Sequence, residues 1–423
     1  MKAVVLAAGE GQRLRPLTLT RPKHLIPVGG KPFLEHLLAA LREAGVSEIL
    51  LVVNYKAEKI KEHLGDGTKF GVKINYALQK ELRGTADAIS TAESYVRNDF
   101  LVVNGDILLT SNVIKSALDI HKENKAAATL AAVLVEQPEH YGVFKLKGNR
   151  VAELVEKPSP EAAAGNPINA GVYVFSKGIF DVIRRTGVSP RGEQEITDSI
   201  RLLIEEGETV VAAKIPSGEW LDIGKPWDLL DANMRVLRQM KSETLGSIEE
   251  NTHLEGQVFI GEGARIRSGS YIEGPAFIGE GSDIGPNCFI RPYTSIGKKA
   301  RIGNACEVKN SIIMDGAHIA HLSYLGDSII GEGCNLGAGS ISANLRFDSG
   351  PIKMRIREDF VDSGKEKIGV IIGDNVKSGI GVLFMPGVKI GCNSWIGPGT
   401  VVYSDVPSDT ILTLKQQTVQ RKR

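Results

Sequence analysis

The sequence is poor in cysteine and carries almost no surplus charge. Its 423 residues include four cysteines, which lie far apart in the second half and form no C-x-x-C pair. Neither a zinc site nor a dithiol redox motif is therefore signalled, and a reducing cytoplasm is the simplest compartment. The formal net charge of +1 gives no overall attraction to nucleic acid or to a membrane surface. We expect neither as a partner.

Long hydrophobic runs are also absent. No segment approaches the ~20 apolar residues that a membrane span requires. The apolar run Ala3–Ala8 is preceded only by Lys2 as a basic residue and is too short for a secretion signal. The composition, 42% hydrophobic and 24% charged, is typical of a soluble globular protein. The length predicts two or three domains, and we expect a soluble, cytoplasmic protein.

The first half alternates two kinds of apolar pattern. Runs typical of buried strands are Lys2–Ala7, Ile49–Val53, Val72–Tyr76 and Phe100–Val103. Apolar residues at helical spacing occupy Pro32–Ala44, Ala57–Leu64 and Thr85–Val96. This β-α-β alternation predicts a Rossmann-like domain over residues 1–240, with a mostly parallel sheet covered on both faces. Ligands of such sheets bind outside the carboxyl ends of the strands.

After Gly246 an aliphatic residue recurs at every sixth position. The unbroken series is Leu254, Ile260, Ile266, Ile272, Ile278, Ile284, Ile290, Ile296, Ile302 and Val308. It continues with two five-residue steps through Ile313, Ile319, Leu325, Ile330 and Leu336, and resumes at Ile372, Ile390, Ile396 and Val402. A six-residue repeat fits neither a helix nor a heptad, and it predicts a parallel β-helix whose aliphatic residues stack in the core.

Residues 241–423 therefore form a second predicted domain. A charged, irregular segment, residues 342–367, interrupts its register, and we expect it to loop out on one face. From Val406 the chain leaves the repeat and ends in the basic sequence Gln420–Arg423, which we expect to form a cap and a frayed tail.

The loop after the first strand carries glycines and fixed positive charges. Gly9 and Gly11 allow backbone N–H groups to approach phosphate oxygens, and Arg13 and Lys23 add cationic side chains. A dinucleotide fingerprint would need a third glycine where Leu14 stands, and no P-loop sequence occurs. The loop thus predicts a phosphate site of another kind.

The segment Leu6–Thr18, followed by Arg21-Pro22-Lys23, resembles the opening motif of the sugar-1-phosphate nucleotidyltransferase family. Further blocks follow in the family's order: Gln79–Ala88, Val103–Asp106, Tyr141-Gly142, Glu156–Pro158, Asn169–Gly171 and Trp220–Gly224. The resemblance covers the whole first half. One departure is Gln12, where the family usually has Thr or Ser, which removes a hydroxyl contact to phosphate.

The resemblance implies a role for each block. Arg13 and Lys23 would be catalytic, holding the triphosphate and the attacked α-phosphate. Asp106 and Asp222 would be ligands of Mg²⁺. The residues implied for nucleotide binding are Leu6, Ala8, Gly9, Gly11, Gln79, Gly84 and Thr85. The residues implied for sugar-phosphate binding are Gly142, Glu156, Lys157 and Asn169. In-line attack of a sugar phosphate on a triphosphate needs mainly positioning and charge neutralisation, which these residue types supply.

The second half has a candidate site at Ala320–Ser328. This run, with Asn335–Gly339 and Asn344–Asp348, resembles the acetyltransferase domain of bifunctional enzymes that make UDP-N-acetylglucosamine, and most closely their archaeal versions. The resemblance implies a left-handed β-helix, a homotrimer and acetyl-CoA bound between neighbouring coils. It makes His321 the general base for the amine of glucosamine-1-phosphate. It also implies that Tyr324, Asn335 and Asn344 contact the substrate, together with a loop lysine, Lys353, Lys365 or Lys367.

Three functions remain open from the sequence. The leading prediction is a bifunctional enzyme that acetylates glucosamine-1-phosphate and then transfers a uridylyl group from UTP to the product. The alternative is a nucleotidyltransferase with a single activity, acting on UTP or dTTP and glucose-1-phosphate, whose β-helix is regulatory or oligomerising. A third possibility is a non-catalytic assembly subunit, which has no use for Arg13, Lys23 and Asp106. Because uracil and thymine differ by one methyl group, either base could be accepted.

Overall fold

The computed structural model describes residues 1–423, and the chain divides into two compact units. The first unit consists of Met1–Glu10, Pro22–Leu25 and Phe33–Ile223. The second consists of Gly11–Arg21, Ile26–Pro32 and Gly224–Arg423. None of the helices combines the length and the apolar character needed to cross a bilayer. Each unit is described by itself.

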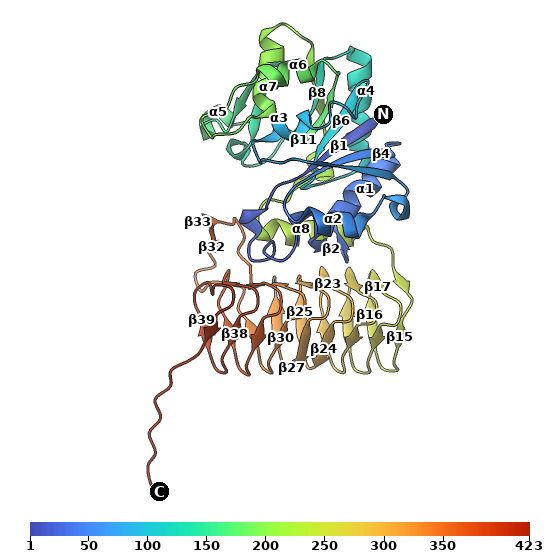
Figure 1. Ribbon diagram of the computed structural model, residues 1–423. Helices are drawn as coiled ribbons and strands as arrows, with labels where there is room; N and C mark the ends of the chain where they lie inside the picture. The colour runs from blue at the N-terminus through green and yellow to red at the C-terminus, as the bar shows by residue number, and fades with distance from the viewer. The chain divides into compact units, whose positions relative to one another are not determined.

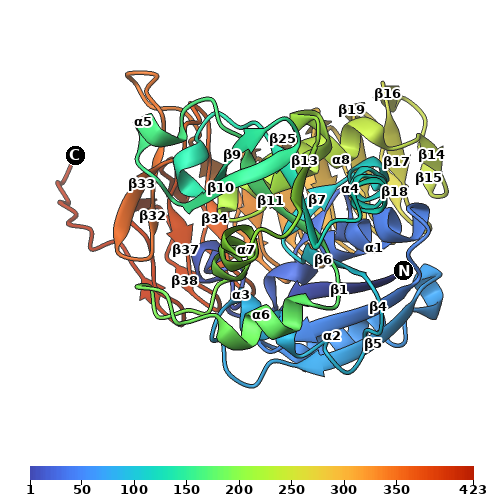
Figure 2. The same ribbon diagram turned by 90° about the horizontal axis from the view of Figure 1, so that it is seen from above.

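The first unit is built on one mixed sheet. Its strands are β1 (Lys2–Ala7), β4 (Glu48–Val53), β5 (Lys73–Leu78), β6 (Phe100–Asn104), β8 (Ala128–Val133), β9 (Gly142–Lys147), β10 (Arg150–Glu156), β11 (Ile168–Phe175) and β12 (Val210–Lys214). They lie in the order β5-β4-β1-β6-β11-β8-β12-β10-β9. The four strands predicted from the sequence, β1, β4, β5 and β6, are adjacent and parallel, whereas β11 runs antiparallel to β6 and β8. β1, β4 and β5 are seen side by side in Figure 2.

Helices cover both faces of this sheet, as the sequence predicts. α1 (Phe33–Glu43), α2 (Ala57–Leu64) and α4 (Ser111–Asn124) share a core with Ala3, Val5 and Ala7 of β1. α3 (Thr85–Ser90), α6 (Ile179–Arg185) and α7 (Ile196–Glu205) share the other core, which includes Val4. Alternate residues of β1 thus point to opposite faces. The short α5 (Pro160–Ala163) is capped by the Ser159 hydroxyl.

The prediction of a helix over Thr85–Val96 was too long, because α3 ends at Ser90. At this end the Ser90 hydroxyl donates to the Asp87 carbonyl, and the Thr91 hydroxyl donates to the Ala88 carbonyl, each at 2.7 Å. Such side-chain bonds compete with the backbone ladder and disfavour continuation of a helix.

The strand order reverses between β1 and β6. From β1 the chain proceeds to β4 and β5 on one side, and then returns to β6 on the other. Leu6 and Asn104 are register partners where the two strands end, and the Gly105 N–H donates to the Leu6 carbonyl at 2.8 Å. A switch point of this kind opens a crevice outside the carboxyl ends of the strands, where ligands of α/β sheets bind.

The second unit is a left-handed parallel β-helix with three sheets. The first contains β14 (Glu243–Thr244), β17 (Val258–Ile260), β20 (Ala276–Ile278), β23 (Thr294–Ile296), β26 (Ile312–Ile313), β29 (Ile329–Ile330), β34 (Ile371–Ile372) and β37 (Lys389–Ile390). The second contains β15 (Ser247–Ile248), β18 (Arg265–Ile266), β21 (Asp283–Ile284), β24 (Arg301–Asn304), β27 (His318–His321), β30 (Asn335–Leu336), β35 (Lys377–Ser378), β38 (Trp395–Ile396) and β40 (Ile411–Leu412). The third contains β16 (His253–Glu255), β19 (Tyr271–Glu273), β22 (Phe289–Ile290), β25 (Glu307–Lys309), β28 (Tyr324–Gly326), β31 (Ile341–Ser342), β36 (Leu383–Phe384) and β39 (Val401–Val402). Figure 1 shows the coils as successive rungs.

The predicted six-residue series forms the core of this β-helix. From Ile260 onward, every aliphatic residue of the series is no more than 2% exposed, and only Leu254 in the first coil is half-buried. Residues of successive coils lie in register, for example Ile260 with Ile278 and Ile278 with Ile296. The hydrophobic repeat of the sequence is therefore confirmed as the stacked interior.

Ser342 still belongs to β31, and the residues after it, up to about 367, lie outside the coils without being irregular throughout. They contain an antiparallel hairpin of β32 (Lys353–Ile356) and β33 (Asp359–Asp362), which projects from the β-helix in Figure 1. β29 pairs directly with β34 across the insertion, so the coils close beneath it. The repeat also extends further than predicted, because β40 pairs with β38 after Val406. Residues from Thr413 onward have no regular structure.

Two segments distant in sequence pack against the β-helix within the second unit. α8 (Pro226–Gln239) contributes Asn233, whose side chain donates to the Tyr293 carbonyl and accepts from the Gly29 N–H, each at 2.8 Å. Gly29 lies in the turn between β2 (Pro27–Val28) and β3 (Lys31–Pro32). The buried Arg21 forms ion pairs with Glu332 and Asp374, which fix the segment Gly11–Arg21 to the coils.

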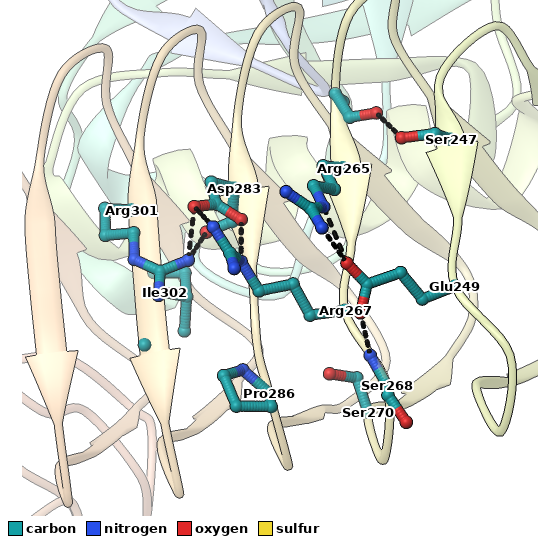
Figure 3. A network of polar contacts seen from close by, with 12 residues as sticks. Ser247, Glu249, Arg265, Arg267, Ser268, Ser270, Asp283, Pro286, Arg301 and Ile302 are labelled. Atoms are coloured by element: carbon teal, nitrogen blue, oxygen red, sulfur yellow. Dashed lines mark hydrogen bonds and ion pairs between the residues drawn. The ribbon is translucent and has the colours of Figure 1, made fainter.

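The outer surface of the second β-helix sheet carries a ladder of ion pairs (Figure 3). Asp283 accepts hydrogen bonds from Arg267 at 2.6 and 2.7 Å and pairs with Arg301 at 2.6 Å. One coil earlier, Glu249 pairs with Arg265. Register places Arg265, Asp283 and Arg301 above one another, so opposite charges alternate along the stack.

Candidate active sites

The first predicted phosphate loop begins where β1 ends. The Leu6 carbonyl accepts from Gly105, and the Ala8 carbonyl accepts from the Tyr55 N–H at 3.3 Å. A Cβ on Gly9 would lie 3.9 Å from both Cε and Nζ of Lys23. The Lys23 ammonium group thus lies over Gly9, although the two residues are far apart along the loop. The structure brings these two predicted residues together.

Lys23 also forms an ion pair with Asp106, at the carboxyl end of β6. The two side chains are only 14% and 21% exposed. Burial alone would raise the pKa of Asp106, but the charge and hydrogen bond of Lys23 outweigh it and hold that pKa below its ordinary value. The carboxyl group is therefore an anion at neutral pH and is available to a cation.

Asp222 lies beside Asp106. It ends β13 (Trp220–Asp222), which pairs antiparallel with β7 (Ile107–Leu109) and sets Asp222 opposite Ile107. The Ile223 N–H donates to the Asp106 carbonyl at 2.9 Å. Two carboxylates on adjacent strand ends suit Mg²⁺, which is commonly held by one or two carboxylates together with substrate phosphates.

His24 is a residue of this site that the sequence analysis missed. It is fully buried, neither ring nitrogen has a hydrogen-bond partner, and a Cβ on Gly105 would lie 3.1 Å from its Cδ2. Burial, with the charge of Lys23 adding to it, lowers the pKa of His24 to about 3. The imidazole is thus neutral, and its proximity to Lys23 in the sequence was the only signal.

The next residues of the loop belong to the second unit. Gly11 has φ +70°, and its carbonyl accepts from the Thr18 hydroxyl at 3.0 Å. It precedes a single 3₁₀ turn, Gln12–Leu14, on which Arg13 is exposed. Only glycine adopts this backbone conformation readily.

The predicted base-binding segment is organised by Gln79. This side chain is 3% exposed, and its amide nitrogen donates to the Gly84 carbonyl at 3.1 Å and to Asp87 at 2.8 Å. Gly84 has φ +124°, and a Cβ there would lie 2.8 Å from the Gln194 backbone nitrogen. The Thr85 hydroxyl accepts from the Ile196 N–H at 2.9 Å. Gln79, Gly84 and Thr85 thus form one connected turn.

The predicted sugar-phosphate residues of the first unit also come together. Gly142 and Glu156 are register partners on β9 and β10, and a Cβ on Gly142 would lie 3.7 Å from Asn169 Cβ on β11. Asn169 donates to the Tyr173 hydroxyl at 2.7 Å. Burial raises the pKa of Glu156, although Arg191 opposes this shift. Lys157 follows with φ +46°.

In the β-helix, Tyr324 and Asn344 contact each other. Asn344 donates to the Tyr324 hydroxyl at 3.3 Å and to the buried carboxylate of Asp327. Burial raises the pKa of Tyr324, and the negative charge of Asp327 raises it further. The Tyr324 hydroxyl therefore stays protonated. His321 is exposed at the end of β27, three residues before Tyr324, and its carbonyl accepts from the Ser323 hydroxyl at 2.8 Å.

Two cations beside this cluster were missed in the sequence. Lys309 lies 3.5 Å from Asp327 and is in register with Gly326. Arg291 occupies the equivalent place one coil earlier. Ile290 and Val308 are register partners that point inward, and Arg291 and Lys309 are the residues directly after them. The signal was a basic residue at the same phase of successive coils. The missing side chain of Gly326 makes room for the Tyr324 hydroxyl and the Asn344 amide, because a Cβ on Gly326 would collide with both groups.

The other predicted residues of the second site lie elsewhere. Asn335 is exposed and lies in register with His318 and Lys377 on the second β-helix sheet. Lys353 is exposed on β32, and Lys365 pairs with Asp231 at 2.8 Å. Lys367 pairs with Leu345, and the next residue, Ile368, donates its N–H to the Asn344 carbonyl at 3.1 Å.

Comparisons with known proteins agree with this architecture. The family described as nucleotidyl transferase matches residues 2–239, and the GMPPB C-terminal domain matches residues 272–382. Because the first match spans more than half of the sequence, the chain belongs to the nucleotidyl transferase family.

Its full-length relatives are bifunctional proteins. The chain is 46% identical to the bifunctional protein GlmU of Methanocaldococcus jannaschii, with 100% of both chains covered. It is 41% identical to the bifunctional sugar-1-phosphate nucleotidylyltransferase/acetyltransferase of Sulfurisphaera tokodaii, with 96% of this chain and 98% of that protein covered. A crystal structure from Bacillus anthracis, assigned as a glucose-1-phosphate thymidylyltransferase, matches with a TM-score of 0.52 at 28% identity. It covers 58% of this chain and 98% of that one.

Proposed function

We propose that the chain makes UDP-N-acetylglucosamine by two consecutive transfers. The β-helix acetylates the amine of glucosamine-1-phosphate with acetyl-CoA, and the first unit then transfers a uridylyl group from UTP to the product. The observation that carries the nucleotidyl transfer is Lys23, which lies over Gly9 and beside Asp106 at the strand switch point. The full-length similarity to bifunctional relatives supports the pairing of the two activities.

In the uridylyl transfer, an oxygen of the sugar phosphate attacks the α-phosphate of UTP in line, and pyrophosphate leaves. The backbone at Gly9 and Gly11 cradles the triphosphate, and Arg13 and Lys23 neutralise its charge. Lys23 is preorganised for this task because the ion pair with Asp106 already fixes its ammonium group. Preorganised charge of this kind contributes most of the catalysis in phosphoryl transfer.

Asp106 and Asp222 are the residues that would hold Mg²⁺. When bound, the ion would neutralise charge on the triphosphate. The buried, anionic state of Asp106 suits a hard cation.

Recognition of the sugar and base follows from the two clusters of the first unit. Gly142, Glu156, Lys157 and Asn169 would bind the sugar phosphate. Gln79 has its amide nitrogen engaged by Gly84 and Asp87, which leaves its carbonyl oxygen to accept from the N3–H of a pyrimidine. Uracil and thymine share this donor, so dTTP is a second candidate substrate, and glucose-1-phosphate is a second candidate sugar.

In the acetyl transfer, His321 takes a proton from the amine of glucosamine-1-phosphate. The amine attacks the thioester carbonyl, the C–S bond breaks, and coenzyme A leaves as a thiol. Tyr324 and Asn344 would orient the sugar, and Lys309 and Arg291 would bind its phosphate. The Tyr324 hydroxyl and the Asn344 amide are suited to contact sugar hydroxyls because both are donors at neutral pH.

The assembly that we propose is a homotrimer through the β-helix. Several large apolar side chains on its outer surface are exposed, namely Leu322, Ile380, Trp395, Tyr403 and Ile411. Trp395 and Ile411 lie in register on neighbouring coils, and adjoining exposed apolar side chains favour association. The four cysteines are all free and buried, which is compatible with the reducing cytoplasm in which we expect the enzyme to act.

The test is to offer the purified full-length protein glucosamine-1-phosphate, acetyl-CoA, UTP and Mg²⁺. We expect free thiol to appear first, followed by pyrophosphate and UDP-N-acetylglucosamine. Omission of acetyl-CoA should stop nucleotide-sugar formation from glucosamine-1-phosphate but not from N-acetylglucosamine-1-phosphate. Pyrophosphate release without any release of thiol would contradict the acetyl transfer and support the alternative, a nucleotidyltransferase with a single activity. Parallel reactions with dTTP and glucose-1-phosphate measure the substrate range.

A further inference from the structure

The second unit contains a cavity that neither proposed reaction uses. Its volume is about 260 Å³, and three segments form its walls. The loop Gly11–Arg21 contributes Arg15, the hairpin of β32 and β33 contributes Arg355 and Arg357, and the final coils contribute Lys389 and Asp405. Four cations against one carboxylate leave a net charge of +3 on the lining. No residue proposed for either active site lines it.

The hairpin keeps its basic side chains off its buried apolar face for a simple reason. Ile352, Met354 and Ile356 alternate with basic residues and are buried, so the hairpin packs its apolar face on the coils. A Cβ on Gly387 would lie 2.7 Å from Cγ2 of Ile352, which shows how closely the hairpin side chains pack on the coils. Arg355 and Arg357 are therefore held on the opposite face, and both are exposed.

Neutralisation of this charge within the protein is incomplete. Lys389 lies 3.3 Å from Asp405 and also donates to the Arg355 carbonyl. Arg355 pairs with Glu358 at 2.9 Å, but the Glu358 side chain is 89% exposed, and such surface pairs contribute little. Arg357 makes no hydrogen bond or ion pair. The positive charge of Arg357 in the cavity lining is therefore not neutralised within the protein.

The opposite wall is fixed in place and contains an unsatisfied hydroxyl group. Thr20 donates to Asp374 at 2.6 Å, and with the Arg21 ion pairs this holds the Arg15 segment against the coils. Ser408 lines the cavity, and its Oγ is buried without a hydrogen-bond partner.

We infer that this cavity binds a small phosphate-bearing anion, such as inorganic diphosphate or a phosphorylated metabolite. Planar guanidinium groups match phosphate oxygens in pairs, and Lys389 supplies a point charge beside them. A water molecule takes about 30 Å³ of liquid, so the cavity has room for more than a single phosphate. Arg15 belongs to the same loop as Gly11 and Arg13. An anion in the cavity would therefore restrict the motion of that loop. An effect of this restriction on uridylyl transfer rests on the proposed function, whereas the binding of the anion does not.

The test is a calorimetric titration of the full-length chain with inorganic pyrophosphate. The variant is Arg355→Ala/Arg357→Ala, and the matched control is Lys298→Ala, which removes one exposed charge from another turn of the β-helix. We expect the wild type and the control to bind one more pyrophosphate per chain than the double variant, or to bind it about tenfold more tightly at that site. The double variant should keep its turnover in uridylyl transfer without added pyrophosphate, which excludes misfolding.

Identical titrations of the wild type and the double variant would overturn the inference. Crystals of the full-length protein soaked in tungstate give the location directly, with anomalous density expected between Arg357 and Lys389. Density confined to the loop over Gly9 would also overturn it. A protein without uridylyl transfer that still shows the extra variant-sensitive site would contradict the proposed function and leave this inference standing.

Discussion

The two proposed active sites differ in how far apart in the sequence their residues lie. In the first unit, Gly9, Lys23, Asp106 and Asp222 come from four separate places in the chain and meet where the strand order reverses. In the β-helix, His321, Tyr324 and Asp327 lie within seven consecutive residues, and the coil register supplies their neighbours. The first site depends on chain topology and the second on the repeat. Substitutions should therefore separate the two activities cleanly.

The largest effect is expected in the β-helix. His321→Ala should lower kcat of acetyl transfer by about 10²–10⁴-fold, because it removes the proposed general base, and should leave uridylyl transfer unchanged. His318→Ala is the matched control, since His318 is an exposed histidine on the same strand. Thiol release from acetyl-CoA measures the first activity, and pyrophosphate release measures the second. Equal losses in both histidine variants, or loss of both activities, would assign His321 a structural role.

The converse effect is expected in the first unit. Lys23→Ala should lower kcat of uridylyl transfer by about 10²–10³-fold, since a preorganised charge over the phosphate loop is lost, while acetyl transfer continues. Lys59→Ala, which removes an exposed lysine from α2, serves as the control. Uridylyl transfer near the wild-type rate in Lys23→Ala would contradict the role of this ion pair.

The sequence predicted the β-helix better than the site within it. A six-residue period gives the inward position of each coil directly, because the side-chain pattern and the stack share one register. The period does not specify which outward-pointing side chains lie next to each other, because that depends on the register between neighbouring coils. The place of Lys309 beside Gly326 became visible only in the structure, because it depends on the single five-residue step from Val308 to Ile313. The hairpin at Lys353–Asp362 was missed because a short charged segment with alternating apolar residues was taken as irregular.

The first unit shows the same division. The strand runs and the phosphate loop were recognisable, since a parallel sheet buries continuous apolar segments. The contact of Lys23 with Asp106 and the burial of His24 depend on a strand order that local patterns do not encode. Gly84 could be recognised from the sequence as part of a motif. The reason that glycine is needed there could not, because the backbone with which a Cβ would collide belongs to Gln194, 110 residues away in sequence.

That long-range constraint predicts a loss of stability confined to the first unit. Gly84→Ala should destabilise it by about 2–3 kcal/mol, because φ of +124° suits only glycine and a Cβ would collide with the Gln194 backbone. Gly148→Ala is the control for an ordinary left-handed glycine, since Gly148 has φ +67° and nothing within 4 Å of its Cβ position. Urea unfolding measures both. Equal destabilisation in the two variants would mean that neither the unusual φ of Gly84 nor the Gln194 contact adds to the cost of an ordinary left-handed position.

The smallest effect concerns the charge ladder of the β-helix. The hydrogen bond from Arg267, opposed by partial burial and assisted by the Arg301 charge, lowers the pKa of Asp283 below the reference value of 3.8. A depressed carboxyl pKa stabilises the fold above pH 3.8, and this contribution is lost as the pH falls through the lower folded-state pKa. Because the Asp283 side chain is 31% exposed, solvent screening keeps the contribution to about 0.2–1 kcal/mol.

Asp283→Asn should therefore be less stable than the wild type at pH 7, and the difference should shrink as the pH falls below about 4. Asp119→Asn on α4 makes the same charge change at an exposed aspartate outside any ion pair. Urea unfolding at pH 7 and in acid measures both variants. If the deficit of Asp283→Asn stayed constant down to acid pH, packing rather than charge would account for it. The ladder would then be a by-product of the register that stacks Arg265, Asp283 and Arg301, and would not stabilise the coils.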